Sequence, residues 1–119
     1  MTAPVQTRPA DAFLAGLRIT ISERGTQTTL ALDGEWDLGE AEATRHAIRA
    51  ALARQPARLV LDLSGLTFID SSGVHILMSL FRRAGRLKIE FAIVPGPPAV
   101  QRIFDICELT ARLPFTNDG

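Results

Sequence analysis

The fold is decided by two adjoining pieces of sequence, Leu59-Val60-Leu61-Asp62-Leu63 and, a few residues later, Asp70-Ser71-Ser72-Gly73. The first is a short and nearly unbroken apolar run, which is typical of a central strand covered on both faces. The second begins a helix that we expect to reach about Ala84 and to close at Gly85. Between them we expect a polar turn before Phe68. A central strand followed by a helix favours the α/β class.

The residues before this segment predict a hairpin and a first helix. Apolar and polar residues alternate over 17–22, Arg24-Gly25 makes a turn, and a second strand covers 28–32 before Asp33-Gly34 breaks it. Asp37, with Glu40 three residues on, is placed to cap a helix over 38–54. The apolar stripe of this helix comprises Ala41, Ala47, Ile48, Ala51 and Leu52, and Glu42, Arg45, His46 and Arg49 lie opposite.

The residues after it predict one more strand over 87–94 and a third helix that starts near Pro98. Residues 113–115 could add a short last strand. We therefore expect a single α/β domain with a mixed, mostly parallel central sheet of about 4–5 strands and about 3–4 helices. We place the domain at residues 15–116, with a flexible lead-in over 1–14 and a tail over 117–119. The inner face of the third helix comprises Val100, Ile103, Phe104 and Cys107.

Composition excludes several classes of function. The chain has 13 basic and 13 acidic residues, and this zero net charge disfavours direct capture of nucleic acid or of a membrane. No secretion signal or membrane span is visible, so we expect a cytoplasmic protein. We further expect a monomer or a weak homodimer. Cys107 is the single cysteine, which predicts a small core residue, and we expect neither a metal site nor a cofactor.

Ser71 is the candidate modification site. The start of a helix carries unpaired backbone N–H groups and the positive end of the helix dipole, so an added phosphate would be well placed there. Asp70 can cap backbone donors or hold a metal ion that a visiting enzyme brings, and Gly73 leaves room for a kinase. Ser72 is the second choice as acceptor. The alternative is that these residues only cap the helix.

The helix that follows Ser71 presents a polar stripe at helical spacing. It comprises His75, Ser79, Arg82, Arg83 and Arg86, with Ile76 and Met78 on its margins. A polar stripe with apolar margins is a plausible surface for binding a protein partner. The alternative is a plain solvated helix face.

Nothing in the sequence favours an enzyme. Asp70, Ser71 and His75 lie close together, but the Gly-x-Ser-x-Gly turn of α/β hydrolases is absent, and a serine and a histidine one helical turn apart are easily accidental. There is also no glycine-rich phosphate-binding loop of the Walker type. We therefore expect a binding protein without catalytic residues.

The run from Leu61 to Gly73 resembles the signature of STAS domains, in particular those of bacterial anti-sigma factor antagonists. The likeness extends to Gly34-Glu35-Trp36-Asp37, to residues 100–104 and to Leu113-Pro114, and it spans about residues 17–115. His75 and Cys107-Glu108-Leu109 depart from the pattern, since relatives often have a small residue and a glycine at these places.

The resemblance implies a regulatory cycle of stress response. In that family a serine kinase that is also the anti-sigma factor phosphorylates the serine after the aspartate, which corresponds to Ser71. The unphosphorylated antagonist binds the anti-sigma factor and frees the sigma factor, and a serine phosphatase restores it. Two other roles stay open: a STAS scaffold or transport-complex subunit in which Ser71 only caps the helix, and a small α/β enzyme or nucleotide-binding protein.

Overall fold

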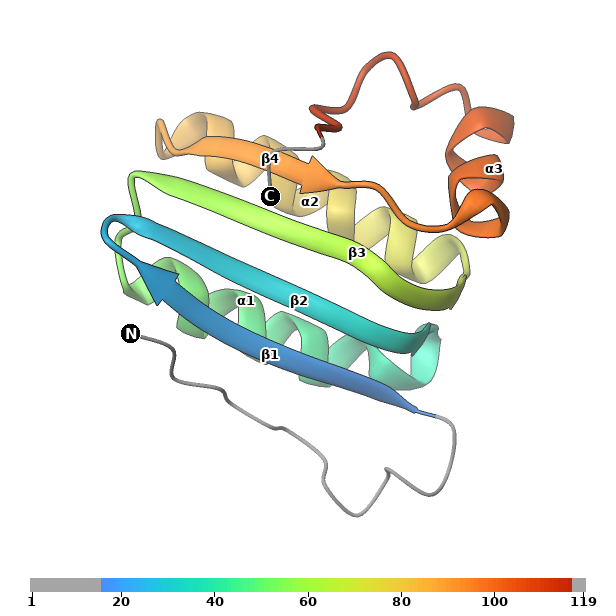
Figure 1. The fold of residues 1–119 in the computed structure, drawn as a ribbon, viewed down its shortest axis with the longest axis horizontal. Helices are drawn as coiled ribbons and strands as arrows, with labels where there is room; N and C mark the ends of the chain where they lie inside the picture. Colours follow the sequence, from blue (N-terminus) through green and yellow to red (C-terminus); the bar gives the residue numbers. More distant parts are fainter. Residues whose placement is uncertain (1–15, 117–119) are drawn as a thin grey trace.

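A computed structural model describes residues 16–116, so the predicted segments 1–14 and 117–119 lie outside the described residues. The described chain forms one four-stranded sheet in the order β1-β2-β3-β4, in which β1 and β2 are antiparallel and the other neighbouring pairs are parallel (Figure 1). The elements are β1 (Leu17–Arg24), β2 (Gln27–Trp36), the 3-10 helix η2 (Leu38–Glu40), α1 (Ala41–Ala53), β3 (Arg58–Ile69), α2 (Ser71–Arg86), β4 (Glu90–Val94) and α3 (Pro98–Ile106).

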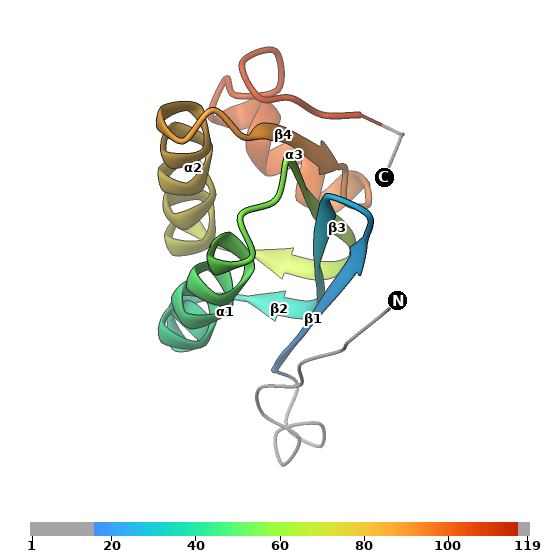
Figure 2. The same ribbon diagram turned by 90° about the vertical axis from the view of Figure 1, so that its left-hand side faces the viewer.

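Two helices cover one face of the sheet. α1 connects β2 to β3 and α2 connects β3 to β4, and because parallel crossovers are right-handed and both move the same way across the sheet, both helices lie on the same side (Figures 1 and 2). The core lies between these layers. One row of paired residues crosses all four strands, and each of them is at most 1% exposed: Ile21, Leu30, Leu61 and Ile93.

The predicted α/β class and mixed sheet are confirmed, as are the opening hairpin and the buried stripe of α1. Two predicted strand ends are wrong. β2 does not stop at Asp33-Gly34 but continues to Trp36. Its pairing with β3 shifts register on both sides of this dipeptide, and Gly34 has a φ of 110°. β3 does not turn after Leu63 but runs to Ile69, with Ser64 and Thr67 exposed on it. Ser64 and Thr67 led to the prediction of a turn, but the exposed positions of a strand can carry polar side chains equally well.

Helix ends also differ from the prediction. Asp37 is an N-cap as expected, and its Oδ1 accepts a hydrogen bond from the Gly39 nitrogen at 3.0 Å, but the first turn is 3-10 and α1 begins only at Ala41. Gly85 does not close α2, which continues to Arg86. Lys88 takes the left-handed conformation at a φ of 60°, and β4 begins at Glu90 rather than at residue 87.

The prediction that Cys107 is a core residue is wrong. α3 buries Val100 and Phe104, but it ends at Ile106, and Cys107 follows as an exposed C-cap. The chain then turns through Glu108, at a φ of 59°. The predicted last strand is a single parallel bridge between Phe115 and Ile93, and the ring of Phe115 packs edge-on against Phe104 at 5.3 Å. Within residues 16–116, no helix is long and apolar enough to cross a membrane.

Candidate docking site around Ser71

The candidate site lies at the edge of the sheet where β2 and β3 end. Trp36 and Ile69 are the last residues of these parallel strands and are paired with each other. The chain therefore leaves both strands side by side, into η2 after β2 and into α2 after β3. The Asp70 nitrogen donates a hydrogen bond to the Trp36 carbonyl at 3.2 Å, which fixes the start of α2 against the end of β2.

Asp70 is the N-cap of α2. Its Oδ1 accepts hydrogen bonds from the nitrogens of Ser72 at 2.9 Å and Gly73 at 3.2 Å and from the Ser72 hydroxyl at 2.6 Å, while Oδ2 accepts one from the Leu38 nitrogen at 3.2 Å. Partial burial raises the pKa of the Asp70 carboxyl group, but these four hydrogen bonds to the charged form together outweigh it and hold the pKa below the ordinary 3.8. The carboxylate is thus ionised and fully engaged in capping at neutral pH.

Ser71 is the first residue of α2 and is exposed, as the sequence predicts. Because Asp70 supplies the cap, the Ser71 side chain is not needed for it, and its hydroxyl makes no hydrogen bond to any other residue of 16–116. Ser72 differs, since it is half-buried and its hydroxyl donates to Asp70. The hydroxyl that is free to accept a group is therefore that of Ser71.

Gly73 has another role than the one predicted. It does not leave open space for a visiting enzyme, because it is buried. A Cβ atom at this position would lie 2.8 Å from Cγ1 of Ile69 and 3.1 Å from both Cδ2 and the carbonyl oxygen of Trp36. The missing side chain lets the first turn of α2 pack directly against the ends of β2 and β3.

Two exposed apolar side chains at this edge were missed by sequence reasoning. Leu38 in η2 is 72% exposed and Phe68 near the end of β3 is 48% exposed. The backbone nitrogen of Leu38 donates a hydrogen bond to the Asp70 carboxylate, and Phe68 lies two residues before Asp70. Strand alternation is the signal that could have found Phe68, because its neighbour Ile69 is 3% exposed and must point the other way. Large apolar side chains that are exposed at the same edge of the sheet as Ser71 suit a protein-binding surface.

The predicted stripe along α2 is largely at the surface. Its exposed members are His75, Ser79, Arg82, Arg83 and Arg86, and Met78 is half-buried. The expectation that Ile76 forms an exposed margin is wrong, since it is 4% exposed and packs in the core cluster. α2 lies beside α1, which the sequence could not place, and this neighbour covers the margin on which Ile76 stands. Among residues 16–116 no three His, Cys, Asp or Glu side chains gather in a way that could hold a metal ion.

A mixed sheet with both crossover helices on one face and a free hydroxyl at the start of the second helix defines a small α/β domain suited to binding. The chain belongs to the STAS domain family, whose sequence profile matches residues 18–118. A relative from Mycobacterium tuberculosis, named anti-sigma-F factor antagonist RsfB, is 32% identical over 86 residues, which cover 72% of this chain and 70% of the relative.

Solved structures agree with this assignment. The crystal structure of an anti-sigma factor antagonist from Mycobacterium paratuberculosis superimposes with a TM-score of 0.78 at 27% identity, covering 86% of each chain. The anti-sigma factor antagonist SpoIIAA in its unphosphorylated form superimposes with a TM-score of 0.70 over 84% of this chain and 89% of its own, and at 20% identity this likeness concerns the fold. The resemblance read from residues 61–73 is therefore confirmed at the level of the family.

Proposed function

We propose that this protein is a cytoplasmic anti-sigma factor antagonist whose binding is switched by phosphorylation of Ser71. In the unphosphorylated form it binds an anti-sigma factor that is also a serine kinase, and so releases a sigma factor. Phosphorylation of Ser71 by that kinase blocks binding, and a serine phosphatase reverses the block. The protein itself performs no catalysis in this cycle. The proposal is supported by the names of its relatives and by the exposed Ser71 hydroxyl, which Asp70 leaves free.

The surroundings of Ser71 suit a switch that leaves the fold intact. A phosphate adds about −1.5 to −2 charges at neutral pH, and at the first residue of α2 it meets the positive end of the helix dipole. The helix therefore tolerates the modification. The exposed apolar side chains of Leu38 and Phe68 make the same place suited to close contact with a partner.

A dianion enclosed in such a contact must be paired or lose its hydration, which is costly. A penalty of about 2.7 kcal/mol weakens binding roughly a hundredfold. The exposed residues of α2, His75, Ser79, Arg82, Arg83 and Arg86, with Met78 beside them, extend the proposed docking surface away from Ser71. Asp70 and Gly73 support the site by fixing the start of the helix.

A STAS scaffold or transport-complex subunit is the rival role, and in it Ser71 would serve only as a cap. The cap of α2 is Asp70, so this rival gives the Ser71 hydroxyl nothing to do. That argument favours the switch without reference to any relative.

The test begins with a pull-down from the native cytoplasm, comparing the wild type with Ser71→Asp, to identify the partner that the negative charge releases. The purified partner is then incubated with ATP and the wild type, Ser71→Ala or Ser72→Ala, and each product is weighed by mass spectrometry. We expect one added phosphate on the wild type and on Ser72→Ala, and none on Ser71→Ala. An active kinase partner that leaves the wild type unmodified would favour the scaffold.

A further inference from the structure

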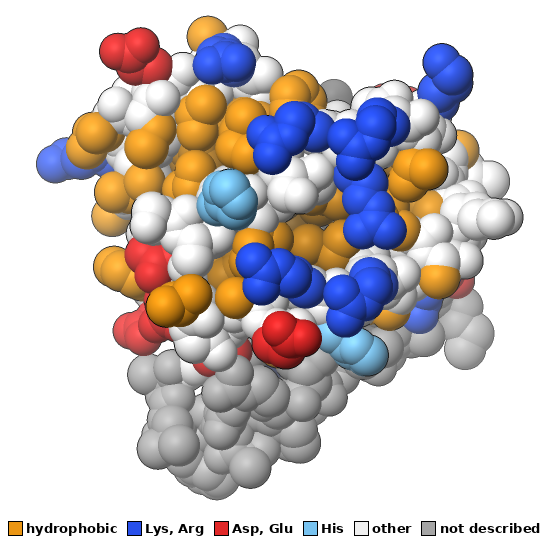
Figure 3. All heavy atoms as spheres, turned by 180° about the vertical axis from the view of Figure 1, so that it is seen from behind, with side chains coloured by type: hydrophobic (Ala, Val, Ile, Leu, Met, Phe, Trp, Pro, Cys, Tyr) orange, Lys and Arg blue, Asp and Glu red, His pale blue; other side chains and the backbone are white. Residues whose placement is uncertain are grey.

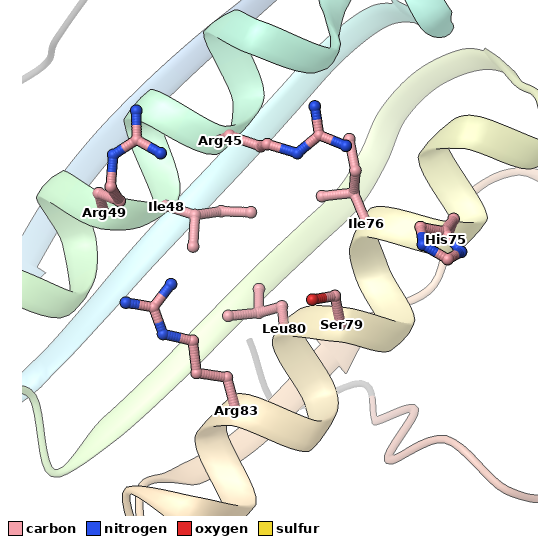
Figure 4. A pocket seen from close by; sticks show the side chains of 8 residues that line it. All are labelled: Arg45, Ile48, Arg49, His75, Ile76, Ser79, Leu80 and Arg83. Carbon is pink, nitrogen blue, oxygen red and sulfur yellow. The ribbon is translucent and has the colours of Figure 1, made fainter.

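A groove between α1 and α2 lies on the same face of the molecule as the stripe of α2. It has a volume of about 180 Å³ and is lined by Arg45, Ile48 and Arg49 from α1 and by His75, Ile76, Ser79, Leu80 and Arg83 from α2 (Figure 4). Figure 3 shows basic side chains gathered around apolar surface on this face. The groove is thus distinct from the edge of the sheet that carries Ser71.

The groove is lined by residues spaced four apart on each of two helices. Arg45 and Arg49 are four residues apart on α1, and His75, Ser79 and Arg83 are spaced by four on α2, so each set lies along one side of its helix. Three aliphatic side chains that join the helices form the floor, and each is at most 6% exposed: Ile48, Ile76 and Leu80. Sequence reasoning placed Arg45 and Arg49 opposite the core and did not bring them to α2.

The charge of the groove is one-sided. Three guanidinium groups and a histidine line it, and no carboxylate does. Within the described residues, the ion pairs that are formed join Arg54 to Glu23 and Arg58 to Glu90, and none involves Arg45, Arg49 or Arg83. Figure 4 shows Arg45 extending from α1 toward α2 and Arg83 extending from α2 toward α1, while Arg49 lies along α1 at the rim of the groove. Unpaired guanidinium groups that converge from two elements are suited to binding carboxylates.

The size of the groove decides between kinds of ligand. Sites that enclose small molecules commonly have volumes of about 300–1,000 Å³. At about 180 Å³ this groove has room for a side chain but not for an enclosed metabolite. We propose that the groove between α1 and α2 binds an acidic segment of a partner protein, with an aliphatic side chain on the floor and carboxylates on Arg45, Arg49 and Arg83.

This inference goes beyond the proposed function, because it requires neither Ser71 nor phosphate. It assigns a role to α1, which the switch does not use. An antagonist that engages a partner here as well as at Ser71 would extend its contact from α2 onto α1, because His75, Ser79 and Arg83 belong both to the groove and to the proposed docking surface of α2.

The test titrates the full chain, labelled with ¹⁵N, with short synthetic peptides. Binding is measured by NMR from the shifts of the backbone amide signals of the labelled chain. The probe is acetyl-Glu-Glu-Leu-Glu-Glu-amide. Its matched controls replace every glutamate by glutamine or the leucine by alanine, and inorganic phosphate serves as an anion without an apolar part. We expect the probe to shift, saturably, the amides of the α1 and α2 residues that line the groove. We expect the glutamine peptide to bind at least about tenfold more weakly.

Variants of the protein then locate the site. The double variant Arg49→Glu/Arg83→Glu reverses two of the three unpaired charges, and Arg102→Glu, alone and combined with Arg112→Glu for an equal change in net charge, reverses exposed arginines outside the groove as the control. The double variant should bind the probe at least about tenfold more weakly than the wild type, while the affinity of Arg102→Glu, alone or combined with Arg112→Glu, for the probe should stay within about twofold of the wild type.

The proposal is overturned if no saturable shift is seen, if the shifts map away from α1 and α2, or if the double variant and the control bind the probe equally. Equal affinity for the leucine and alanine peptides, or displacement by phosphate at comparable concentration, would reduce the groove to a site for small anions and would also overturn it. Because no measurement uses the kinase, failure here is separate from failure of the Ser71 switch.

Discussion

The carboxylate of Asp70 accepts a hydrogen bond from the backbone nitrogen of Leu38 at 3.2 Å, across 32 residues of sequence. The same side chain caps α2 through the nitrogens of Ser72 and Gly73. One residue therefore holds together the two segments that leave the sheet at this edge, and it keeps Ser71 at the start of the helix with its hydroxyl free.

Asp70→Ala should lower the free energy of unfolding by about 1–2 kcal/mol at neutral pH, because the cap and the link to η2 are both lost. The pKa of Asp70 is lowered in the folded state, so its contribution is present above the unfolded pKa and disappears as the pH falls through the folded pKa. Urea unfolding of the wild type and Asp70→Ala between about pH 7 and about pH 2 measures this, and the difference should shrink on acidification.

The matched control for this prediction is Asp33→Ala, an exposed carboxylate in β2. Its removal should change stability by less than about 0.5 kcal/mol. A stability difference for Asp70→Ala that stays constant down to the lowest pH would show that the charged carboxylate is not the stabilising form.

Charge at position 71 should decide partner binding without disturbing the fold. Ser71→Asp and Ser71→Glu should weaken binding of the partner kinase by about tenfold or more, and Ser71→Ala should bind like the wild type and stay bound in the presence of ATP. Isothermal titration with the partner gives the affinities, and thermal unfolding checks the fold. Ser79→Asp, on the same proposed docking surface two turns further along α2, should weaken binding less than Ser71→Asp if the position of the charge matters as well as its presence. Equal affinity of all variants would contradict the charge argument.

Arg82→Glu should weaken binding of the partner kinase while leaving the melting temperature within about 2 °C, because Arg82 is exposed and its charge contributes little to folding. Arg102→Glu, an exposed arginine on α3, is the control of equal charge change. If both variants bind the partner as the wild type does, the exposed face of α2 is not part of the interface.

The class of fold could be predicted because its determinants are local. The nearly unbroken apolar run at 59–63, the alternation at 17–22 and the caps Asp37 and Asp70 each specify an element by themselves. Segment ends were harder, since Ser64 and Thr67 are equally compatible with a turn and with an exposed strand. Cys107 was misplaced because helical periodicity was continued one residue past the end of α3.

The site could be predicted only in part, for a related reason. Ser71 stands out because its exposure follows from its position at the start of a helix that Asp70 caps. The burial of Ile76, and the placement of Arg49 and Arg83 around one groove, depend on how α1 packs beside α2. Periodicity identifies the inner face of one helix but says nothing about which neighbour covers its sides.

Two glycines of the same helix provide a matched test of how closely α2 approaches the sheet. Gly73 and Gly85 both lie within α2, where alanine is intrinsically favoured over glycine by about 1 kcal/mol. A Cβ at Gly85 would meet nothing within 4 Å, so Gly85→Ala should raise the free energy of unfolding by about 0.5–1 kcal/mol.

At Gly73 the added Cβ would lie 2.8 Å from the Ile69 side chain and 3.1 Å from the Trp36 carbonyl oxygen. Ile69 is 3% exposed and Trp36 is fully buried, so neither can yield without disturbing the core. Overpacking of this kind costs about 1–3 kcal/mol and exceeds the gain in helix propensity, so Gly73→Ala should lower stability by about 1 kcal/mol. Urea unfolding of both variants measures the two changes in the free energy of unfolding, which should have opposite signs. If Gly73→Ala were as stabilising as Gly85→Ala, the start of α2 would not be packed tightly against β2 and β3, and the fixed position of Ser71 would lose its structural basis.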